Sequence, residues 1–187
     1  MKMSLRTMAA VALLLAGCAK NKIPEVGASS GDEKPLSESG LTKQPIDLDA
    51  DEVPEIFNYY RDLEGGGQLL VKKEIDLNRD GKVDVISYYD DQSRLQKEMM
   101  DGDYDGLFDW ADYYEQGTRV RSEYDTDFDG KANVWKYYVS DDGGEPRVDR
   151  LERDIDGDGV VDLTRQFNAA GEVTDTRRTT QSDELQE

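Results

Sequence analysis

An Asp-rich pattern of nine residues recurs along the chain, and it restricts the possible folds more than any other feature. Four copies begin at Asp76, Asp101, Asp125 and Asp154 and have the form D-x-[DN]-x-D-G-x-x-[DN]. A weaker copy begins at Asp47, so that successive first residues are 29, 25, 24 and 29 positions apart. Near-constant spacing of this kind predicts one short structural unit that the chain uses several times.

The segments on both sides of the Asp-rich copies have the composition of β-strands. They are rich in β-branched and aromatic residues, and side chains two positions apart share their character, which places them on one face of a sheet. The segments are 69–75, 119–124 and 148–153 before the copies, and 83–89 and 132–139 after them. Clusters of turn-forming residues separate the repeats at 90–93, 116–117, 141–144 and 169–171.

These elements predict an all-β fold, an antiparallel meander of repeated β-hairpins with about eight to ten strands. The Asp-rich loops and the plain turns would alternate at the two ends of the strands. The sequence leaves open whether the strands form an open twisted sheet or a curled barrel. The Tyr-Tyr pairs that follow the loops, such as Tyr88-Tyr89, are interpreted as cross-strand packing residues and not as a ligand cage.

The Asp-rich loops have the chemistry of a Ca²⁺ site, because Ca²⁺ takes six to eight oxygen ligands. Side chains at positions 1, 3 and 5 would converge on the ion, position 7 would offer its backbone carbonyl, and position 9 would bind directly or through water. Glycine at position 6 allows the sharp turn. The predicted ligands are Asp76, Asn78, Asp80, Lys82, Asp84, Asp101, Asp103, Asp105, Leu107, Asp109, Asp125, Asp127, Asp129, Lys131, Asn133, Asp154, Asp156, Asp158, Val160 and Asp162.

The weaker copy is a doubtful fifth site, with Asp47, Asp49, Asp51 and Glu55 as its candidate ligands. Glu52 stands where glycine is expected, and Pro54 stiffens the exit from the loop. The alternative interpretation is a capping repeat that holds no ion. About four Ca²⁺ ions per chain are therefore expected.

The loops resemble the first nine positions of the EF-hand loop, but the EF-hand pattern also requires a Glu at position 12 between two helices. Here that position holds Ser87, Asp112, Lys136 and Arg165. The run 76–86, DLNRDGKVDVI, is more similar to the loops of FG-GAP and VCBS repeats, in which an Asp-rich loop leads into an apolar strand. This resemblance covers about nine residues per repeat and implies the ion site, not the propeller fold of those families.

The charge of the chain is concentrated in these loops. The sequence has 42 acidic and 23 basic residues, and 18 of the acids occupy predicted ligand positions. This arrangement argues against general disorder, and so acidic a protein is not expected to bind nucleic acid. The sequence contains no histidine, which removes the usual general base, so the expected function is not enzymatic. A carboxylate-based hydrolase of cell-wall glycans is the less favoured alternative.

The N-terminus has the features of an export signal: Lys2 and Arg6 precede an apolar run that ends before Cys18. Leu15-Ala16-Gly17-Cys18 resembles the lipobox of bacterial lipoproteins, which implies cleavage before Cys18 and lipidation of its thiol. The expected segments are a signal peptide (1–17), a lipidated flexible linker (18–45), a calcium-loop repeat domain (46–178) and a disordered acidic tail (179–187).

The expected protein is therefore a lipid-anchored, calcium-stabilised structural or interaction module of the bacterial envelope. The residue after the cysteine, Ala19, is typical of lipoproteins that reach the outer membrane, facing the periplasm or the cell surface. An accessory subunit of an adhesion, secretion or motility complex is the alternative, with a protein partner that the sequence does not identify.

Overall fold

The computed structural model describes residues 38–141 and 144–179. The predicted signal peptide, Cys18 and most of the predicted linker lie outside the described residues, as does the predicted tail after residue 179. The described residues include no helical segment that could span a membrane.

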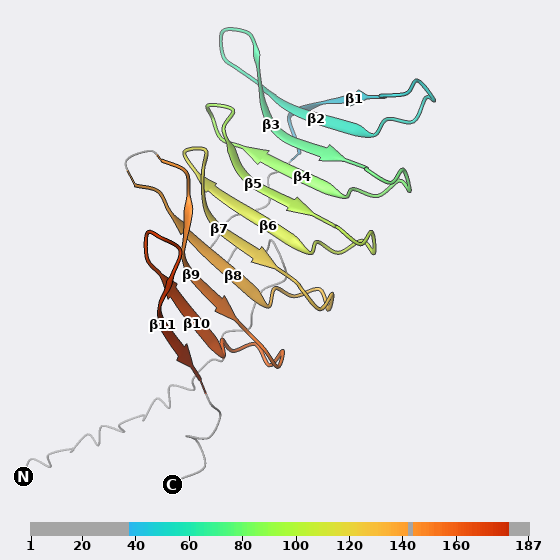
Figure 1. The fold of residues 1–187 in the computed structure, drawn as a ribbon. Coiled ribbons are helices and arrows are strands. Elements are labelled where there is room, and N and C mark those ends of the chain that lie inside the picture. Colours follow the sequence, from blue (N-terminus) through green and yellow to red (C-terminus); the bar gives the residue numbers. More distant parts are fainter. Residues whose placement is uncertain (1–37, 142–143, 180–187) are drawn as a thin grey trace, which may run out of the picture.

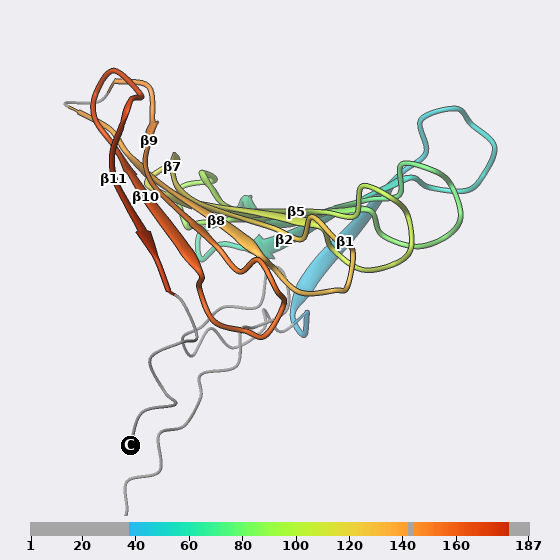
Figure 2. The same cartoon turned by 60° about the horizontal axis from the view of Figure 1, so that its bottom comes forward.

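The described residues form one antiparallel sheet of eleven strands, and each strand pairs with its neighbours in the sequence (Figure 1). The strands are β1 (Leu41–Ile46), β2 (Ile56–Asp62), β3 (Gln68–Ile75), β4 (Val85–Tyr89), β5 (Leu95–Met100), β6 (Trp110–Glu115), β7 (Thr118–Tyr124), β8 (Val134–Val139), β9 (Arg147–Arg153), β10 (Leu163–Phe167) and β11 (Val173–Arg178). The all-β meander predicted from the sequence is confirmed. The sheet is a single open layer with β1 and β11 at its two edges (Figure 2).

The number of strands exceeds the expected eight to ten because the sheet extends further toward the N-terminus. β1 begins at Leu41, inside the segment interpreted as linker. The strands after the loops begin later than predicted, β4 at Val85 and β8 at Val134, because loop positions 8 and 9 close the loop before the strand starts.

All five Asp-rich loops lie at the same end of the strands, and the plain turns lie at the other end (Figure 1). This follows from the meander, in which every second connection returns to the same side. We number the loops in chain order as loop 1 (47–55), loop 2 (76–84), loop 3 (101–109), loop 4 (125–133) and loop 5 (154–162).

A register shift accompanies each tyrosine pair. The pairing shifts between Tyr59 and Tyr60, and it does so again at Tyr88/Tyr89, Tyr113/Tyr114 and Tyr137/Tyr138. The fifth repeat shifts between Gln166 and Phe167. Because a β-bulge bends its strand and increases the local twist, a bulge at the same place in every hairpin gives the sheet a regular curvature.

One face of the sheet carries the main hydrophobic cluster. Met99, Ala111, Ala132 and Trp135 form its buried centre, and partly buried side chains such as Ile86 pack against it. A second row of partly apolar character lies on the opposite face and includes Val85, Trp110, Val134 and Leu163. The single layer therefore has apolar contacts on both faces.

Tyrosines and cations alternate across the first face. Successive strands place Tyr59, Lys72, Tyr88, Lys97, Tyr113, Arg121, Tyr137 and Arg150 opposite one another. We call these residues the tyrosine–cation row.

The contacts within this row repeat from hairpin to hairpin. The Arg121 guanidinium lies 4.0 Å from the ring centroid of Tyr113, and that of Arg150 lies 3.9 Å from Tyr137. The hydroxyl of Tyr113 donates to Glu123 at 2.9 Å, and the hydroxyl of Tyr59 donates to Glu74 at 2.6 Å. Cation–π contacts and charge-assisted hydrogen bonds thus link neighbouring strands where the sheet has no second layer among its described residues.

The opposite face contains a buried polar cluster around Asp112, which is 2% exposed. Its carboxylate accepts hydrogen bonds from the hydroxyl of Ser122 and from Arg119 Nη1, the latter at 3.3 Å. Burial, together with the charges of Asp112 and Glu98, raises the pKa of Tyr114 to about 12. This face is therefore held by cross-strand polar contacts as well as by apolar packing.

The tyrosine–cation row predicts a loss of stability at alkaline pH. Burial, with the nearby charge of Glu123, raises the pKa of Tyr113 well above its ordinary value of 10.0. Above pH 10.0 the unfolded chain loses this proton before the folded chain does, so the free energy of unfolding falls as pH rises. Urea unfolding between about pH 8 and 12 measures this slope.

The matched variants for this measurement are Tyr113→Phe and Tyr104→Phe, because Tyr104 lies exposed in loop 3. Tyr113→Phe is expected to flatten the alkaline slope, and Tyr104→Phe is not. Equal slopes in wild type and Tyr113→Phe would contradict the assignment of the alkaline sensitivity to this row.

Candidate metal sites

The aspartate at position 1 organises each loop through two backbone hydrogen bonds. In loop 3, Asp101 accepts the N–H of Tyr104 at 2.7 Å and the N–H of Gly106 at 2.8 Å, one on each carboxylate oxygen. The same pair, from positions 4 and 6, occurs at Asp47, Asp76, Asp125 and Asp154. The first carboxylate of every loop therefore fixes the direction in which the chain turns.

Positions 5 and 9 add further hydrogen bonds that the loops share. The carboxylate at position 5 accepts the N–H of position 7, as Asp105 does from Leu107 at 2.7 Å. The side chain at position 9 accepts the N–H of position 2, as Asp109 does from Gly102 at 2.6 Å. At position 7, Lys82, Lys131 and Val160 donate in the same way as Leu107. All loops thus have one backbone plan.

Two residues of each loop have a left-handed backbone. Position 6 was predicted to do so, and its φ ranges from 72° at Glu52 to 99° at Gly106. Position 4 was not predicted, although Ala50, Arg79, Tyr104 and Phe128 all have φ between 60° and 66° there. Residue types do not predict this conformation, because four of the five residues are not glycine. Its cause is the hydrogen bond from the position 4 N–H to the position 1 carboxylate.

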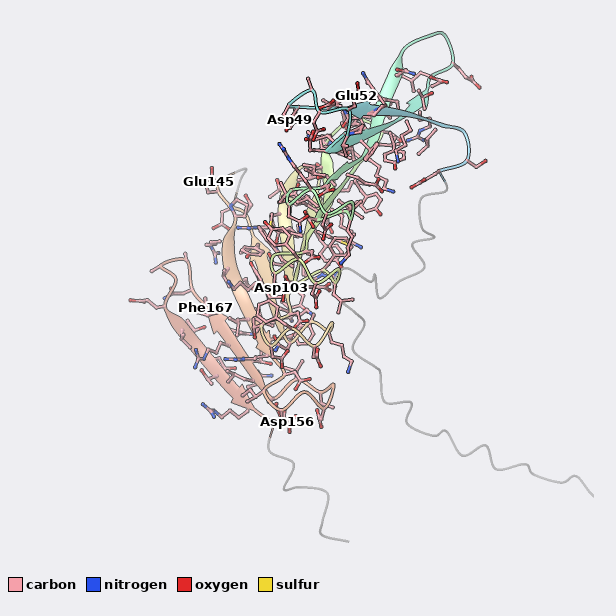
Figure 3. All side chains as sticks on the ribbon, turned by 90° about the vertical axis from the view of Figure 1, so that its right-hand side faces the viewer. Asp49, Glu52, Asp103, Glu145, Asp156 and Phe167 are labelled. Atoms are coloured by element: carbon pink, nitrogen blue, oxygen red, sulfur yellow. The ribbon has the colours of Figure 1, made fainter. Side chains whose placement is uncertain are left out.

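In four loops the acidic side chains converge closely enough to hold a metal ion. Within each group the ligand atoms lie within 4.8 Å of one another. The groups are Asp47, Asp49, Asp51 and Glu55 in loop 1; Asp101, Asp103 and Asp109 in loop 3; Asp125, Asp127 and Asp129 in loop 4; and Asp154, Asp156 and Asp162 in loop 5. Figure 3, which views the molecule from the loop end, shows Asp49, Asp103 and Asp156 in succession from top to bottom. The structure therefore places several acidic groups, each able to hold a metal ion, in one line.

Loop 2 contains no such group, although its hydrogen bonds match those of the other loops. Every convergent group includes an acid at position 3, and loop 2 has Asn78 there. Its acids Asp76, Asp80 and Asp84 occupy positions 1, 5 and 9. In loops 3 and 5 the acids at position 5, Asp105 and Asp158, also lie outside the groups. Asp105 and Asp158 accept the N–H groups of Leu107 and Val160, as Asp129, a member of the loop 4 group, does from Lys131.

Loop 1 was the doubtful copy, yet its four acids lie together. The predicted difficulty at Glu52 is present, because this residue has φ of 72° without being glycine. Glu55, which is longer than the Asp of the other loops, still accepts the N–H of Leu48 at 2.9 Å. The longer side chain at position 9 therefore preserves the plan of the loop.

The carboxylates of the loops influence one another's pKa. Burial raises the pKa of Asp109, and the charges of Asp103 and Asp101 raise it further. Hydrogen bonds from backbone N–H groups lower this pKa but do not cancel the rise. Burial also raises the pKa of Asp127, with a contribution from its neighbour Asp125. Partly buried acids that repel one another are stabilised when a proton or a cation binds between them.

Neighbouring loops are linked through their backbones. The N–H of Asp101 in loop 3 donates to the carbonyl of Asp84 in loop 2 at 2.8 Å. The same bond from position 1 to position 9 of the preceding loop occurs at Asp76, Asp125 and Asp154. Leu107 also lies against the next loop, since its Cδ1 is 3.1 Å from where a Cβ on Gly130 would stand. The five loops therefore form a connected ladder.

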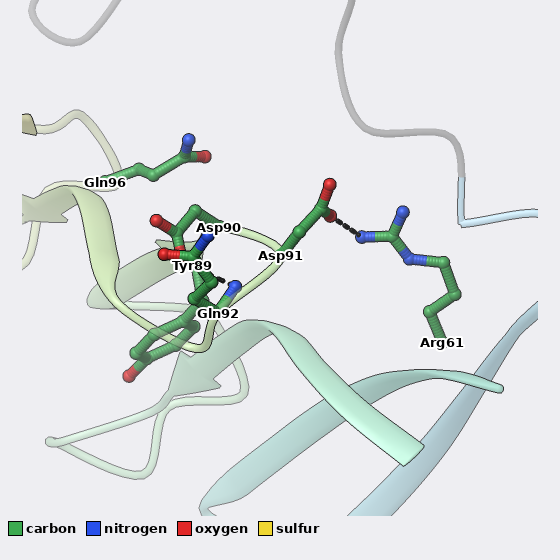
Figure 4. A pocket seen from close by; sticks show the side chains of 6 residues that line it. All are labelled: Arg61, Tyr89, Asp90, Asp91, Gln92 and Gln96. Carbon is green, nitrogen blue, oxygen red and sulfur yellow. Dashed lines mark hydrogen bonds and ion pairs between the residues drawn. The ribbon is translucent and has the colours of Figure 1, made fainter. Parts of the chain in front are cut away.

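Glu98 in β5 and Glu115 in β6 are acidic residues that lie outside the Asp-rich loops. An open hollow at the plain-turn side is lined by Arg61, Tyr89, Asp90, Asp91, Gln92 and Gln96 (Figure 4). Neither Glu98 nor Glu115 lines it. Glu98 lies opposite Asp112 in the sheet and accepts a hydrogen bond from Ser87 at 2.8 Å.

No protein-family model matches the chain, and no curated protein matches it. Among solved structures, the GtfA/B complex aligns with a TM-score of 0.40 and 14% identity over 54% of this chain and 19% of that one. Accessory secretory protein 1, 2 and 3 of Streptococcus pneumoniae aligns with a TM-score of 0.39 and 13% identity over 62% of this chain and 19% of that one. The chain spans about a fifth of the length of these structures, and such likenesses indicate neither a family nor a function.

The left-handed position 6 predicts opposite effects of two substitutions. Gly159→Ala is expected to lower the free energy of unfolding by about 1–2 kcal/mol, because a Cβ disfavours this conformation. Gly159 has φ of 90° and open space around the site of a Cβ, so backbone strain is the only cost. Glu52→Gly should instead stabilise loop 1. Urea unfolding in EDTA measures both, and an unchanged stability for Gly159→Ala would contradict the assignment.

Proposed function

We propose that this chain is a non-enzymatic, lipid-anchored Ca²⁺-binding protein of the bacterial envelope, in which the ions rigidify a structural or interaction module. The observation that carries the proposal is the repetition of one loop plan at one end of the strands, with convergent acids in four of the five loops. A turn alone requires far fewer carboxylates than these loops contain.

The donor set favours Ca²⁺ over other metals. Only oxygen ligands are present in the convergent groups, and Ca²⁺ accepts six to eight such ligands in flexible geometry. The chain has no histidine and a single cysteine, so the usual ligands of zinc are missing. Mg²⁺ is smaller and retains its water more strongly, which disfavours a site built from several carboxylates.

The ions would act on the fold as cross-links between strands. Each loop joins two adjacent strands, and the backbone ladder joins each loop to the next. Neutralising the repulsion within one loop would therefore steady its hairpin and the neighbours that bond to it. Extracellular calcium modules bind with dissociation constants of about 10⁻⁴ to 10⁻³ M, which suits structural ions in a calcium-rich medium.

The position in the envelope rests on the N-terminal sequence. The lipobox-like Leu15-Ala16-Gly17-Cys18 supports export and lipidation, and Ala19 supports transfer to the outer membrane. Acyl chains on one residue would anchor the protein firmly, since each buried CH₂ contributes about 0.8 kcal/mol. The repeat domain would then stand away from the membrane on the segment that follows Cys18.

Calcium is expected to raise the melting temperature of the protein. The test is a thermal melt with millimolar CaCl₂ and with EDTA, with MgCl₂ as the control for a general effect of divalent charge. Removal of Ca²⁺ should lower the melting temperature because the acids of each loop then repel one another. Equal melting in CaCl₂ and EDTA would reject the calcium proposal.

Two substitutions at position 3 sharpen this test. Asn78→Asp supplies the acid that loop 2 lacks and is expected to increase calcium affinity, whereas Asp103→Asn removes one from the group in loop 3 and is expected to decrease it. Asp91→Asn, in a plain turn, is the matched control. Calcium titrations in which all three variants behave alike would show that the loops are not the sites.

Lipidation at Cys18 predicts that the protein partitions with membranes in a bacterial host. Cys18→Ser should release it into the soluble fraction and abolish incorporation of radiolabelled palmitate, because the thiol is the acceptor. Incorporation of label into Cys18→Ser would contradict the anchor while leaving the calcium proposal unaffected.

A further inference from the structure

Loop 1 differs from the other loops because a side chain of the neighbouring loop enters its acidic group. The guanidinium of Arg79, which lies in loop 2, forms an ion pair through Nη1 with Asp49 Oδ2. Its Nε lies 3.5 Å from Glu55 Oε1. Asp49 and Glu55 are both members of the convergent group of loop 1. A cation supplied by the chain therefore already lies among these acids.

The conformation of loop 2 directs Arg79 into this position. Arg79 occupies position 4, where φ is 65° and the backbone N–H donates to Asp76 at 2.6 Å. The N–H of Asp76 in turn donates to the carbonyl of Glu55 at 2.8 Å, which holds loop 2 beside loop 1. The residues at position 4 of the remaining loops are Ala50, Tyr104, Phe128 and Gly157, none of which has a positive charge.

Glu55 provides independent evidence that loop 1 is built around a cation. Its side chain is 7% exposed, and Oε1 has no hydrogen-bond partner among the described residues. An ionised carboxylate buried in this way is costly unless a positive charge lies near it. Arg79 is the cation that faces Oε1, and the charges of Asp49, Glu55 and Asp51 raise the pKa of Arg79.

We propose that loop 1 takes the guanidinium of Arg79 in place of a metal ion, and that removing this side chain opens the loop to Ca²⁺. The inference rests on the proposed function for the chemistry of the loops, but the occupancy by Arg79 is a separate claim. Loop 1 is then a capping repeat whose counter-ion comes from loop 2, and Arg79 of that loop regulates whether loop 1 can bind metal.

The first test counts bound calcium by equilibrium dialysis of the full-length chain in detergent against CaCl₂. Arg79→Ala is expected to bind one ion more than wild type, and Asp49→Asn should remove that extra ion. In the wild-type background Asp49→Asn should leave the count unchanged. Arg61→Ala is the matched control, because its 2.8 Å ion pair with Asp91 lies at the plain-turn end.

Two results for the number of bound Ca²⁺ ions would reject the proposal about Arg79. If Arg79→Ala binds no additional ion, or if Asp49→Asn lowers the count in the wild-type background, the proposal is wrong. In the second case loop 1 would hold metal despite the arginine.

A second measurement separates this proposal from the calcium function. In EDTA, Arg79→Ala is expected to lower the melting temperature by about 2–4 °C, and by less when Asp49→Asn is also present. If no variant binds calcium, the proposed function fails, and this double-mutant cycle then decides the claim about Arg79. Coupling between the two substitutions supports the guanidinium as the cation of loop 1, and additive shifts overturn it.

Discussion

One carboxylate that accepts two backbone N–H groups underlies the whole arrangement of the loops. At position 1 of each loop it binds the N–H groups of positions 4 and 6 and so stabilises two left-handed residues. The chain then returns beside itself, and the position 9 N–H donates to the carbonyl that precedes the loop, as Asp109 does to Met100 at 2.9 Å. The same aspartate donates its own N–H to the loop before, so one residue sets both the turn and the spacing of the repeats.

The sheet uses contacts between adjacent strands where most folds use contacts between layers. Only a few hydrophobic side chains of the described residues are buried, with Met99, Ala111, Ala132 and Trp135 at the centre. Tyrosines, cations and glutamates supply the remaining contacts across the strands, as in the set of Tyr113, Arg121 and Glu123. A structure made of nearest-neighbour contacts gains little from distant repeats, so the order of each hairpin depends mainly on its own loop and on the next strand.

The sequence predicted those features that repeat as residue types. The loops, the strands that flank them and the left-handed position 6 follow from recurring Asp, Gly and β-branched residues. The left-handed position 4 escaped prediction because Ala50, Tyr104 and Phe128 share no chemical property that requires it. The bulge at Tyr113/Tyr114 was not predicted. A register shift depends on how two strands pair, and the sequence of one strand does not reveal it.

The sequence predicted which residues make up the candidate sites. It did not predict which acids converge within a loop or which charged residue of another loop contacts them. Position 9 accommodates Glu55, and each convergent group of acids includes position 3, where loop 2 has Asn78. The sequence did not predict that Arg79 takes part in loop 1. Arg79 belongs to loop 2, and its partner Asp49 lies 30 residues earlier in the chain. Such contacts depend on how adjacent repeats are placed, which only the three-dimensional arrangement provides.

The sheet of the described residues has an odd number of strands, which limits how it can associate with copies of itself. β1 and β11 both run toward the end that carries the Asp-rich loops, because odd-numbered strands all have the same direction. If β11 of one molecule met β1 of another with their loops on the same side, the junction would be parallel and would break the hydrogen-bond pattern of the meander. Pro45 in β1 also has no backbone N–H that could donate a hydrogen bond to an added strand. A head-to-tail fibre that continues the described sheet with all its loops on one side is thus disfavoured by the direction of the two edge strands.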